Sequence, residues 1–195
     1  MRISEISRKT SETDIWVKLN IDGVGNGSIS TGIGFFDHML NLLTRHSLFD
    51  LELKAVGDLH VDFHHTVEDV GISLGSAFRE AISDKRGINR YGFSSLPMDE
   101  TLVNVSLDVS GRPHLVLVNP LQDRAAGDFP LDLVRVFFHA FSDRAGITAH
   151  ATVITGTNAH HAAEALFKGF ARALREAVAI DPRVKDVPST KGSLD

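Results

Sequence analysis

Two similar stretches decide how this chain folds: HHTVEDVGISLGSAFREAI at residues 64–82 and HHAAEALFKGFARALREAV at residues 160–178. Apolar residues recur at helical spacing in both, which predicts two amphipathic helices. When the two stretches are aligned, a rare triplet coincides: His64, His65 and Glu68 fall on His160, His161 and Glu164. A triplet repeated at the same place in two helices indicates an internal duplication.

The elements predicted around these stretches follow a similar order in both halves. Strands are predicted over 14–22 and 51–58 in the first half, and over 101–111, 115–119 and 146–155 in the second. Helices are predicted over 35–46, 64–82, 132–143 and 160–178. Each half is therefore a β-α-β-α type unit, and the fold class is α+β with helices on one face of the sheets. We expect a single domain, 1–195, with pseudo-symmetric halves of about 1–92 and 93–195.

Composition excludes several kinds of site. The 195 residues are 43% hydrophobic and 23% charged, which is typical of a soluble globular protein. The net charge of −5, with no basic stripe, argues against nucleic acid as the partner. The absence of cysteine excludes disulfides, thiolate metal sites and cysteine nucleophiles. Because the sequence has neither a signal peptide nor a run of membrane-spanning length, we expect a cytoplasmic protein without a membrane partner.

Helix geometry shows how the repeated triplet can bind metal. Residues three or four apart share a helix face, whereas adjacent residues point about 100° apart. His65 and Glu68 can therefore chelate one ion, while His64 points to another. With the second copy doing the same, two helices related by a pseudo-two-fold axis can exchange their outlying histidines and complete two sites.

The alternative is that these histidines are solvated residues at the start of a helix. For a single copy of the triplet, this interpretation is about as good as a metal site. Because the triplet occurs twice, the metal site is favoured. Nitrogen and oxygen ligands without thiolate suit Mn²⁺, Fe²⁺ or Zn²⁺, and open positions favour Mn²⁺. The zinc-protease pattern HExxH does not apply, because each glutamate lies outside its histidine pair.

Four separated motifs resemble imidazoleglycerol-phosphate dehydratases. They are GIGFFDHML (32–40), DFHHTVED (62–69), NAHHAAEALFKGFARAL (158–174) and PSTKGSL (188–194), and the similarity runs from Arg8 to Leu194. The resemblance implies a hydro-lyase that converts imidazole glycerol phosphate to imidazole acetol phosphate in histidine biosynthesis. It also implies two Mn²⁺ per active site, a ribosomal protein S5 domain 2-like fold, and a 24-subunit homo-oligomer with active sites at subunit interfaces.

The resemblance assigns metal ligands to seven positions: His38, His64, His65, Glu68, His160, His161 and Glu164. We expect one site from His38, His65 and Glu68 with His160 of the partner subunit. The second would then combine His161 and Glu164 with His64 of the partner subunit. The family often has a further histidine ligand where this chain has Val136, and His139 is the candidate replacement, with water as the alternative.

The resemblance also implies substrate contacts. Arg90, Arg112, Ser189, Thr190 and Lys191 match the phosphate-binding positions, where cationic donors suit a dianion. Without the family match they would be interpreted as surface residues and a flexible C-terminus. His46 falls in a substrate-contacting stretch, where Ser47 replaces the usual glycine. The remaining substrate contacts are expected from Glu12, His38, His64, His65 and His160.

The implied chemistry gives these residues distinct roles. The proton to be removed is barely acidic, so we expect the substrate ring to react as a metal-stabilised imidazolate through a diazafulvene-like intermediate. Glu12 is the candidate acid/base residue, with Glu68 and Glu164 as ligands that also relay protons. Two rival functions remain open: a di-metal phosphate-ester hydrolase and a non-catalytic metal-storage protein.

Overall fold

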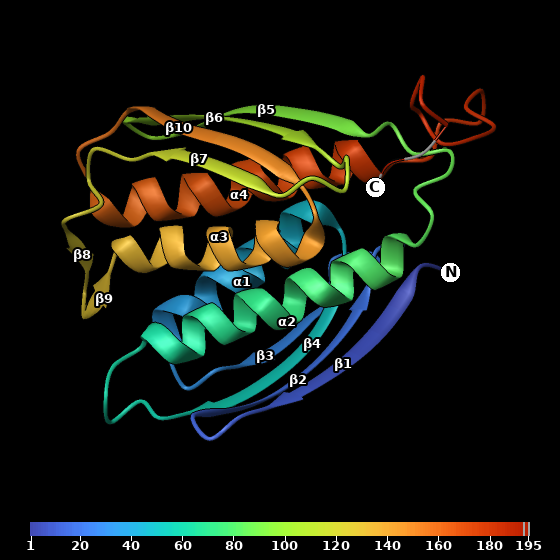
Figure 1. Cartoon of the computed structure of the whole chain (residues 1–195). Helices are drawn as coiled ribbons and strands as arrows, with labels where there is room; N and C mark the ends of the chain where they lie inside the picture. Colours follow the sequence, from blue (N-terminus) through green and yellow to red (C-terminus); the bar gives the residue numbers. More distant parts are fainter. Residues whose placement is uncertain (193, 195) are drawn as a thin grey trace.

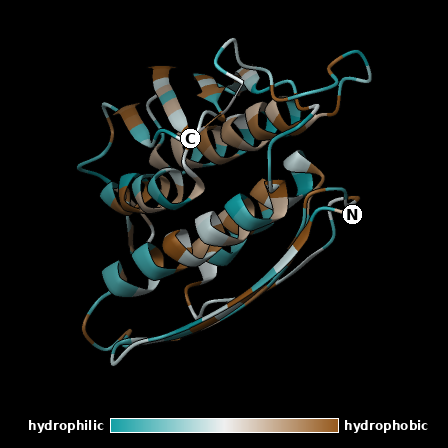
Figure 2. Cartoon of the chain, turned by 45° about the vertical axis from the view of Figure 1, so that its right-hand side comes forward, coloured by the Kyte–Doolittle hydropathy of each residue, from teal (hydrophilic) through white to brown (hydrophobic). Residues whose placement is uncertain are grey.

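Helices form the centre of the molecule, and a four-stranded sheet covers them on either side (Figure 1). The structure is a computed structural model that describes residues 1–192 and residue 194. Ser193, within the C-terminal motif, lies outside the described residues. Hydrophobic and hydrophilic residues alternate along the helix ribbons (Figure 2), as in amphipathic helices that bury one face.

The first half forms a sheet with the strand order β1-β2-β4-β3, in which only β3 and β4 pair in parallel. Two helices cover its inner face. The elements of this half are β1 (Ile3–Lys9), β2 (Thr13–Asn20), β3 (Gly27–Ser30), α1 (Gly34–Ser47), β4 (Asp50–Gly57) and α2 (His64–Ile82).

The second half repeats this topology with the strand order β5-β6-β10-β7, and again only one pair, β7 and β10, is parallel. Its elements are β5 (Tyr91–Met98), β6 (Thr101–Asp108), β7 (His114–Val118), α3 (Asp132–Ala145), β10 (Thr148–Thr155) and α4 (Ala159–Val178). A small hairpin of β8 (Ala125–Ala126) and β9 (Phe129–Pro130) is inserted before α3. The matching strand orders confirm the predicted α+β fold and its duplication.

The four helices form at the predicted places, but each half has more strands than its sequence pattern indicates. β1 and β3 are additional in the first half, and β5 and the short strands β8 and β9 are additional in the second. β1, β3 and β5 are edge strands of the two four-stranded sheets. The division of the chain near residue 92 stays a prediction, and β5 runs across it. Among the described residues, no helix has the length and apolar character needed to cross a membrane.

The helices pack in two pairs, α2 with α3 and α1 with α4. Glycines allow the first pair to approach closely. A Cβ at Gly71 would lie 2.8 Å from the carbonyl oxygen of Phe137, and one at Gly75 would lie 2.5 Å from that of Phe141. The second pair places His38, on α1, beside the first turns of α4. This packing therefore determines which of the predicted metal ligands meet.

Candidate metal and catalytic site

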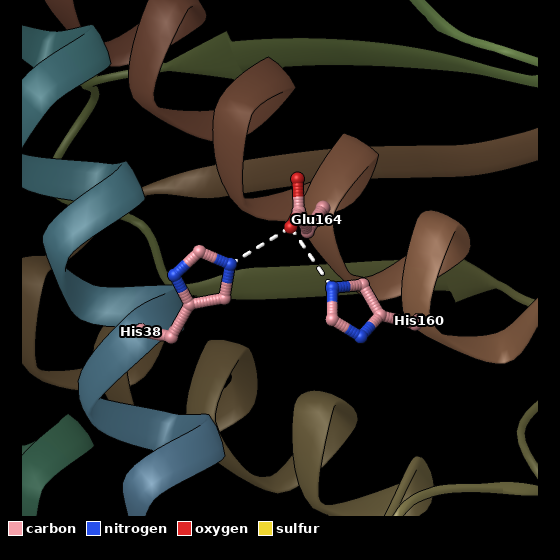
Figure 3. Close-up of side chains that lie close together, drawn as sticks. All are labelled: His38, His160 and Glu164. Atoms are coloured by element: carbon pink, nitrogen blue, oxygen red, sulfur yellow. Dashed lines mark hydrogen bonds and ion pairs between the residues drawn. The ribbon is translucent and has the colours of Figure 1, made fainter.

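Three residues from two helices converge on one point. Nε2 of His38 lies 2.8 Å from Oε1 of Glu164, and Nε2 of His160 lies 2.9 Å from the same oxygen (Figure 3). Their potential ligand atoms all lie within 4.8 Å of one another. Within the described part of the chain, this is the one group of three or more histidine and acidic residues close enough to hold a metal ion.

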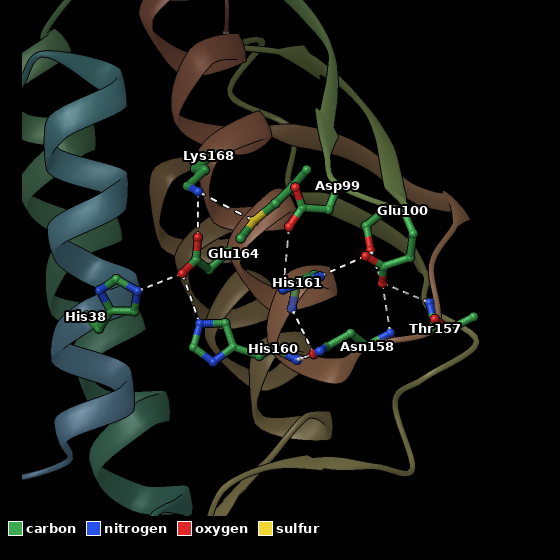
Figure 4. A network of polar contacts seen from close by, with 11 residues as sticks. His38, Asp99, Glu100, Thr157, Asn158, His160, His161, Glu164 and Lys168 are labelled. Atoms are coloured by element: carbon green, nitrogen blue, oxygen red, sulfur yellow. Dashed lines mark hydrogen bonds and ion pairs between the residues drawn. The ribbon is translucent and has the colours of Figure 1, made fainter.

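The start of α4 fixes two members of this group. Asn158 caps the helix, because its side-chain oxygen accepts the backbone N–H groups of His160 and His161. His160 and Glu164 are four residues apart and therefore share a helix face. Lys168, one further turn along, donates to Oε2 of Glu164 at 2.5 Å (Figure 4).

Glu164 is buried but charged. Burial raises the pKa of this carboxyl group, yet hydrogen bonds from Lys168, His38 and His160 outweigh burial and lower the pKa to about 2. A carboxylate that stays ionised in a buried position is suited to bind a cation.

The second histidine of each pair points elsewhere and meets a carboxylate. Nδ1 of His161 lies 2.7 Å from Glu100, whose other oxygen accepts the N–H groups of Asn158 and Thr157 (Figure 4). These contacts lower the pKa of Glu100 to about 2, and the hydrogen bond with His161 is the largest cause. Asp99 lies 3.9 Å from Nε2 of His161.

The first copy of the motif has a similar arrangement. Nδ1 of His65 lies 2.9 Å from Asp58, and this contact is the main cause of the raised pKa of His65. Nε2 of His65 lies 3.9 Å from the carboxylate of Glu12. The side chains of His64 and Glu68 are exposed, and His64 borders a cavity of about 310 Å³.

The expected grouping of ligands is wrong within one chain. We expected His38 to join His65 and Glu68, but the structure places it with His160 and Glu164 of the same chain. The reason is helix pairing, because α1 packs on α4 whereas α2 packs on α3. The prediction that adjacent histidines face different ways is confirmed, but the pairing with the glutamate is reversed. His160, and not the expected His161, meets Glu164, whereas His161 meets Glu100.

His139, the candidate for the further metal ligand, does not reach the His38 group, and Val136 occupies the position of the usual ligand. Val136 is partly buried and packs against the hydrophobic core. His139, one turn later on α3, is exposed and borders a cavity of about 40 Å³ with His114 and Asp143.

The residues expected to bind phosphate gather at the start of β5, whereas Glu100 and His161 lie beyond its end. Arg90 makes a two-pronged ion pair with Asp108 at 2.7 and 3.1 Å and donates to the carbonyl oxygen of Pro188. Arg112 lies 3.6 Å from Asp108. The contact with Pro188 holds the segment containing Ser189, Thr190 and Lys191 beside Arg90. The structure thus brings together cationic groups that the sequence places far apart.

His46 lies on the last turn of α1 and borders a cavity of about 790 Å³ with Arg172 and Arg175. Burial lowers the pKa of His46, and the positive charges of Lys168, Arg172 and Arg45 add to this effect. The ring is therefore favoured in its neutral form at neutral pH.

Sequence reasoning missed five polar residues that surround the site. They are Asp58, Asp99, Glu100, Lys168 and Arg172. A signal was available for two of them, because Lys168 and Arg172 follow Glu164 at intervals of four residues on one helix face. The three acidic residues lie outside the helices, and only the folded strands bring them to the histidines.

Comparison with known proteins shows the family to which the chain belongs. The family model described as imidazoleglycerol-phosphate dehydratase matches residues 31–174. The dehydratase of Azorhizobium caulinodans is 59% identical over 195 residues, which is all of this chain and 99% of that protein. The dehydratase of Methylobacterium radiotolerans is 57% identical, with both chains fully covered.

Solved structures of the same enzyme also match. The crystal structure of the Staphylococcus aureus dehydratase has a TM-score of 0.83 at 40% identity, covering 92% of this chain and 99% of that one. That of the Pyrococcus furiosus dehydratase has a TM-score of 0.84 at 36% identity, covering 97% and 100%. The chain therefore belongs to the imidazoleglycerol-phosphate dehydratase family and is an enzyme of the hydro-lyase class.

Proposed function

We propose that this enzyme dehydrates imidazole glycerol phosphate to imidazole acetol phosphate in a metal-dependent reaction, with two Mn²⁺ per active site. The observation that carries the metal dependence is the group formed by His38, His160 and Glu164. Family membership supports the substrate and the place in histidine biosynthesis. The proposal includes a cytoplasmic location, as is usual for a biosynthetic enzyme.

The residues present fit a divalent metal ion. Two imidazole nitrogens and one ionised carboxylate make a mixed nitrogen and oxygen donor set, which Mn²⁺ accepts. Three ligands leave coordination positions open for a substrate. The second ion would be held by the remaining histidines and Glu68, which come from both motifs.

One chain cannot complete the active site, because its two parts lie at opposite ends of β5. Arg90 directly precedes this strand, and Glu100, which contacts His161, follows shortly after its end. Eight residues of strand at about 3.3 Å each span roughly 26 Å. In imidazole glycerol phosphate, three carbons separate the ring from the phosphate, so one molecule cannot reach both ends. This separation supports active sites that are shared between subunits. The family resemblance suggests an assembly of 24 subunits.

Each group of residues then has a task. Arg90, Arg112, Ser189, Thr190 and Lys191 would hold the phosphate by charge-assisted hydrogen bonds. When bound, the metal ions would stabilise the deprotonated form of the substrate's imidazole ring and so promote loss of the neighbouring hydroxyl group.

Glu12 is the proposed residue for proton transfer. Its side chain is 50% exposed and stands 3.9 Å from the ring of His65, a proposed metal ligand. A carboxylate at this position can take the proton from the substrate carbon and return it in the later enol-to-ketone step. Glu68 and Glu164 remain candidates for relaying protons.

The test is to incubate the Mn²⁺-loaded, assembled protein with imidazole glycerol phosphate and analyse the products. We expect a ketone that retains its phosphate. Release of inorganic phosphate would instead support the di-metal hydrolase, and no conversion despite bound metal would support metal storage. Either of these outcomes contradicts the proposal.

A further inference from the structure

Glu12 and Glu100 occupy the same position in the two halves of the duplicated fold. In the first half, Thr10 pairs with Thr13 at the end of the β1–β2 hairpin, and residues 11 and 12 form its tip. In the second half, Met98 pairs with Thr101 at the end of the β5–β6 hairpin, and residues 99 and 100 form its tip. Each glutamate is thus the second tip residue of its hairpin, and each lies near the second histidine of its motif.

The two glutamates nevertheless differ in their contacts. Glu100 accepts hydrogen bonds on both carboxylate oxygens, from the backbone of Thr157 and Asn158 on one and from Nδ1 of His161, at 2.7 Å, on the other. Glu12 stands at 3.9 Å from His65, beyond hydrogen-bonding distance, with half of its side chain exposed. Glu100 is therefore held in place, whereas Glu12 can move to meet a substrate.

The two halves use carboxylates from different places to hold the second histidine of each motif. In the first half, Asp58 directly follows β4 and holds Nδ1 of His65 at 2.9 Å. By strand register, the corresponding residue of the second half is Thr157, because Gly57 pairs with Thr13 and Gly156 lies beside the equivalent Thr101. Thr157 has no carboxylate, and His161 is held instead by Glu100 from the hairpin tip. The same ring nitrogen is held in both halves, by residues from different parts of the fold.

We propose that Asp58 and Glu100 are positioning residues that hold the rings of His65 and His161 with Nδ1–H toward the carboxylate and Nε2 free to bind metal. Because Asp58 holds the histidine in the first half, Glu12 is available for proton transfer, whereas the equivalent Glu100 is not. The inference rests on the proposed function, since it takes both histidines as metal ligands. Histidines that bind metal commonly donate their second ring N–H to a carboxylate, which fixes the tautomer.

The first test measures Mn²⁺ affinity by titration of the metal-stripped, full-length protein. Loss of such a partner typically weakens metal binding by 10- to 100-fold, and we expect a loss of about this size for Glu100→Ala and Asp58→Ala. Glu100→Gln keeps an acceptor oxygen and should lose less. Glu52→Gln, on the outer face of the first sheet, is the matched control and should change nothing. Affinity within twofold of the parent for both alanine variants overturns the proposal.

The second test reads the tautomer directly. In solid-state ¹⁵N spectra of histidine-labelled, metal-free protein at alkaline pH, His161 should carry its proton on Nδ1, with its signal assigned from the His161→Gln variant. In Glu100→Ala the proton should move mostly to Nε2. An unchanged tautomer overturns the positioning role, even if metal affinity falls, because the effect would then be one of charge alone.

Neither measurement uses the substrate, so failure of the inference and failure of the proposed function are distinguishable. If metal affinity and tautomer change as expected but no ketone forms, the positioning role stands and the dehydratase function fails. Glu12→Gln completes the comparison: it should keep Mn²⁺ affinity within twofold of the parent and lose dehydration. A loss of Mn²⁺ affinity in Glu12→Gln as large as that in Glu100→Ala contradicts the division of roles.

Discussion

Thr13→Val tests whether the hairpin that carries Glu12 is anchored to the helix of the first histidine motif. The hydroxyl group of Thr13 donates to Asp69 on α2 at 2.5 Å, and both side chains are buried. Asp69 also forms an ion pair with Arg8. Asp69 therefore joins the hairpin to the helix directly beside Glu68.

The cost follows from the nature of this hydrogen bond. A hydrogen bond to a charged group contributes about 1.5–3 kcal/mol, and valine cannot replace it. For a chain of this size, 1 kcal/mol shifts the midpoint of thermal unfolding by about 2–4 °C. We therefore expect Thr13→Val to lower Tm by roughly 3–12 °C and to lower kcat for dehydration, because Glu12 loses its fixed position.

Differential scanning calorimetry and a dehydration assay measure the two effects. Thr152→Val, half-buried on the outer face of the second sheet, is the control and should stay within about 0.5 kcal/mol of the parent. If Thr13→Val has the Tm and kcat of the parent, Asp69 does not anchor the hairpin and the reasoning is refuted.

Three further predictions concern packing, charge and metal. Gly75→Ala should destabilise the fold by about 1–3 kcal/mol, because its Cβ would lie 2.5 Å from the carbonyl oxygen of Phe141. Gly34→Ala is the control, because a Cβ at Gly34 has no atom within 4 Å, and urea unfolding compares the stability of the two variants. Glu164 has its pKa lowered from 4.5 to about 2, so its stabilising contribution is full above pH 4.5 and is lost as pH falls toward 2. Removing a hydrogen bond that lowers this pKa, by Lys168→Met, should make the loss smaller and end it at a higher pH in scans of Tm against pH; superimposable curves would contradict this. Chelation of the metal should abolish dehydration, and Mn²⁺ should restore it; full activity in metal-stripped protein would contradict the metal dependence.

The helices could be predicted from sequence because their apolar faces repeat with a clear period. α2 is predicted as residues 64–82 and forms as His64–Ile82. Each of these helices buries one continuous stripe, so local sequence carries the information.

Strand β5 could not be predicted in the same way, because its pattern is reversed. Its large side chains, Tyr91 and Phe93, point outward, whereas Gly92 and Ser94 face the helices. A Cβ at Gly92 would lie 1.9 Å from the carbonyl oxygen of Ala173, so α4 crosses the strand where only glycine fits. This close approach is a property of the packed structure, and the local sequence does not reveal it.

The candidate site could likewise be predicted from the sequence only in part. The candidate ligands on α2 and α4 could be found from the repeated triplet, because spacing along a helix determines which side chains share a face. The partner of His38 does not, because it depends on which helix α1 packs against. The contact between Glu100 and His161 depends in turn on the strand register that brings the hairpin tip beside the start of α4.

The most direct test of the central claim is a crystal structure of the Mn²⁺-soaked protein with diffraction data collected at the manganese absorption edge. We expect an anomalous density peak bound by Nε2 of His38, Nε2 of His160 and the carboxylate of Glu164. A fully assembled protein with no peak among these three residues, although Mn²⁺ is in excess, would contradict the claim.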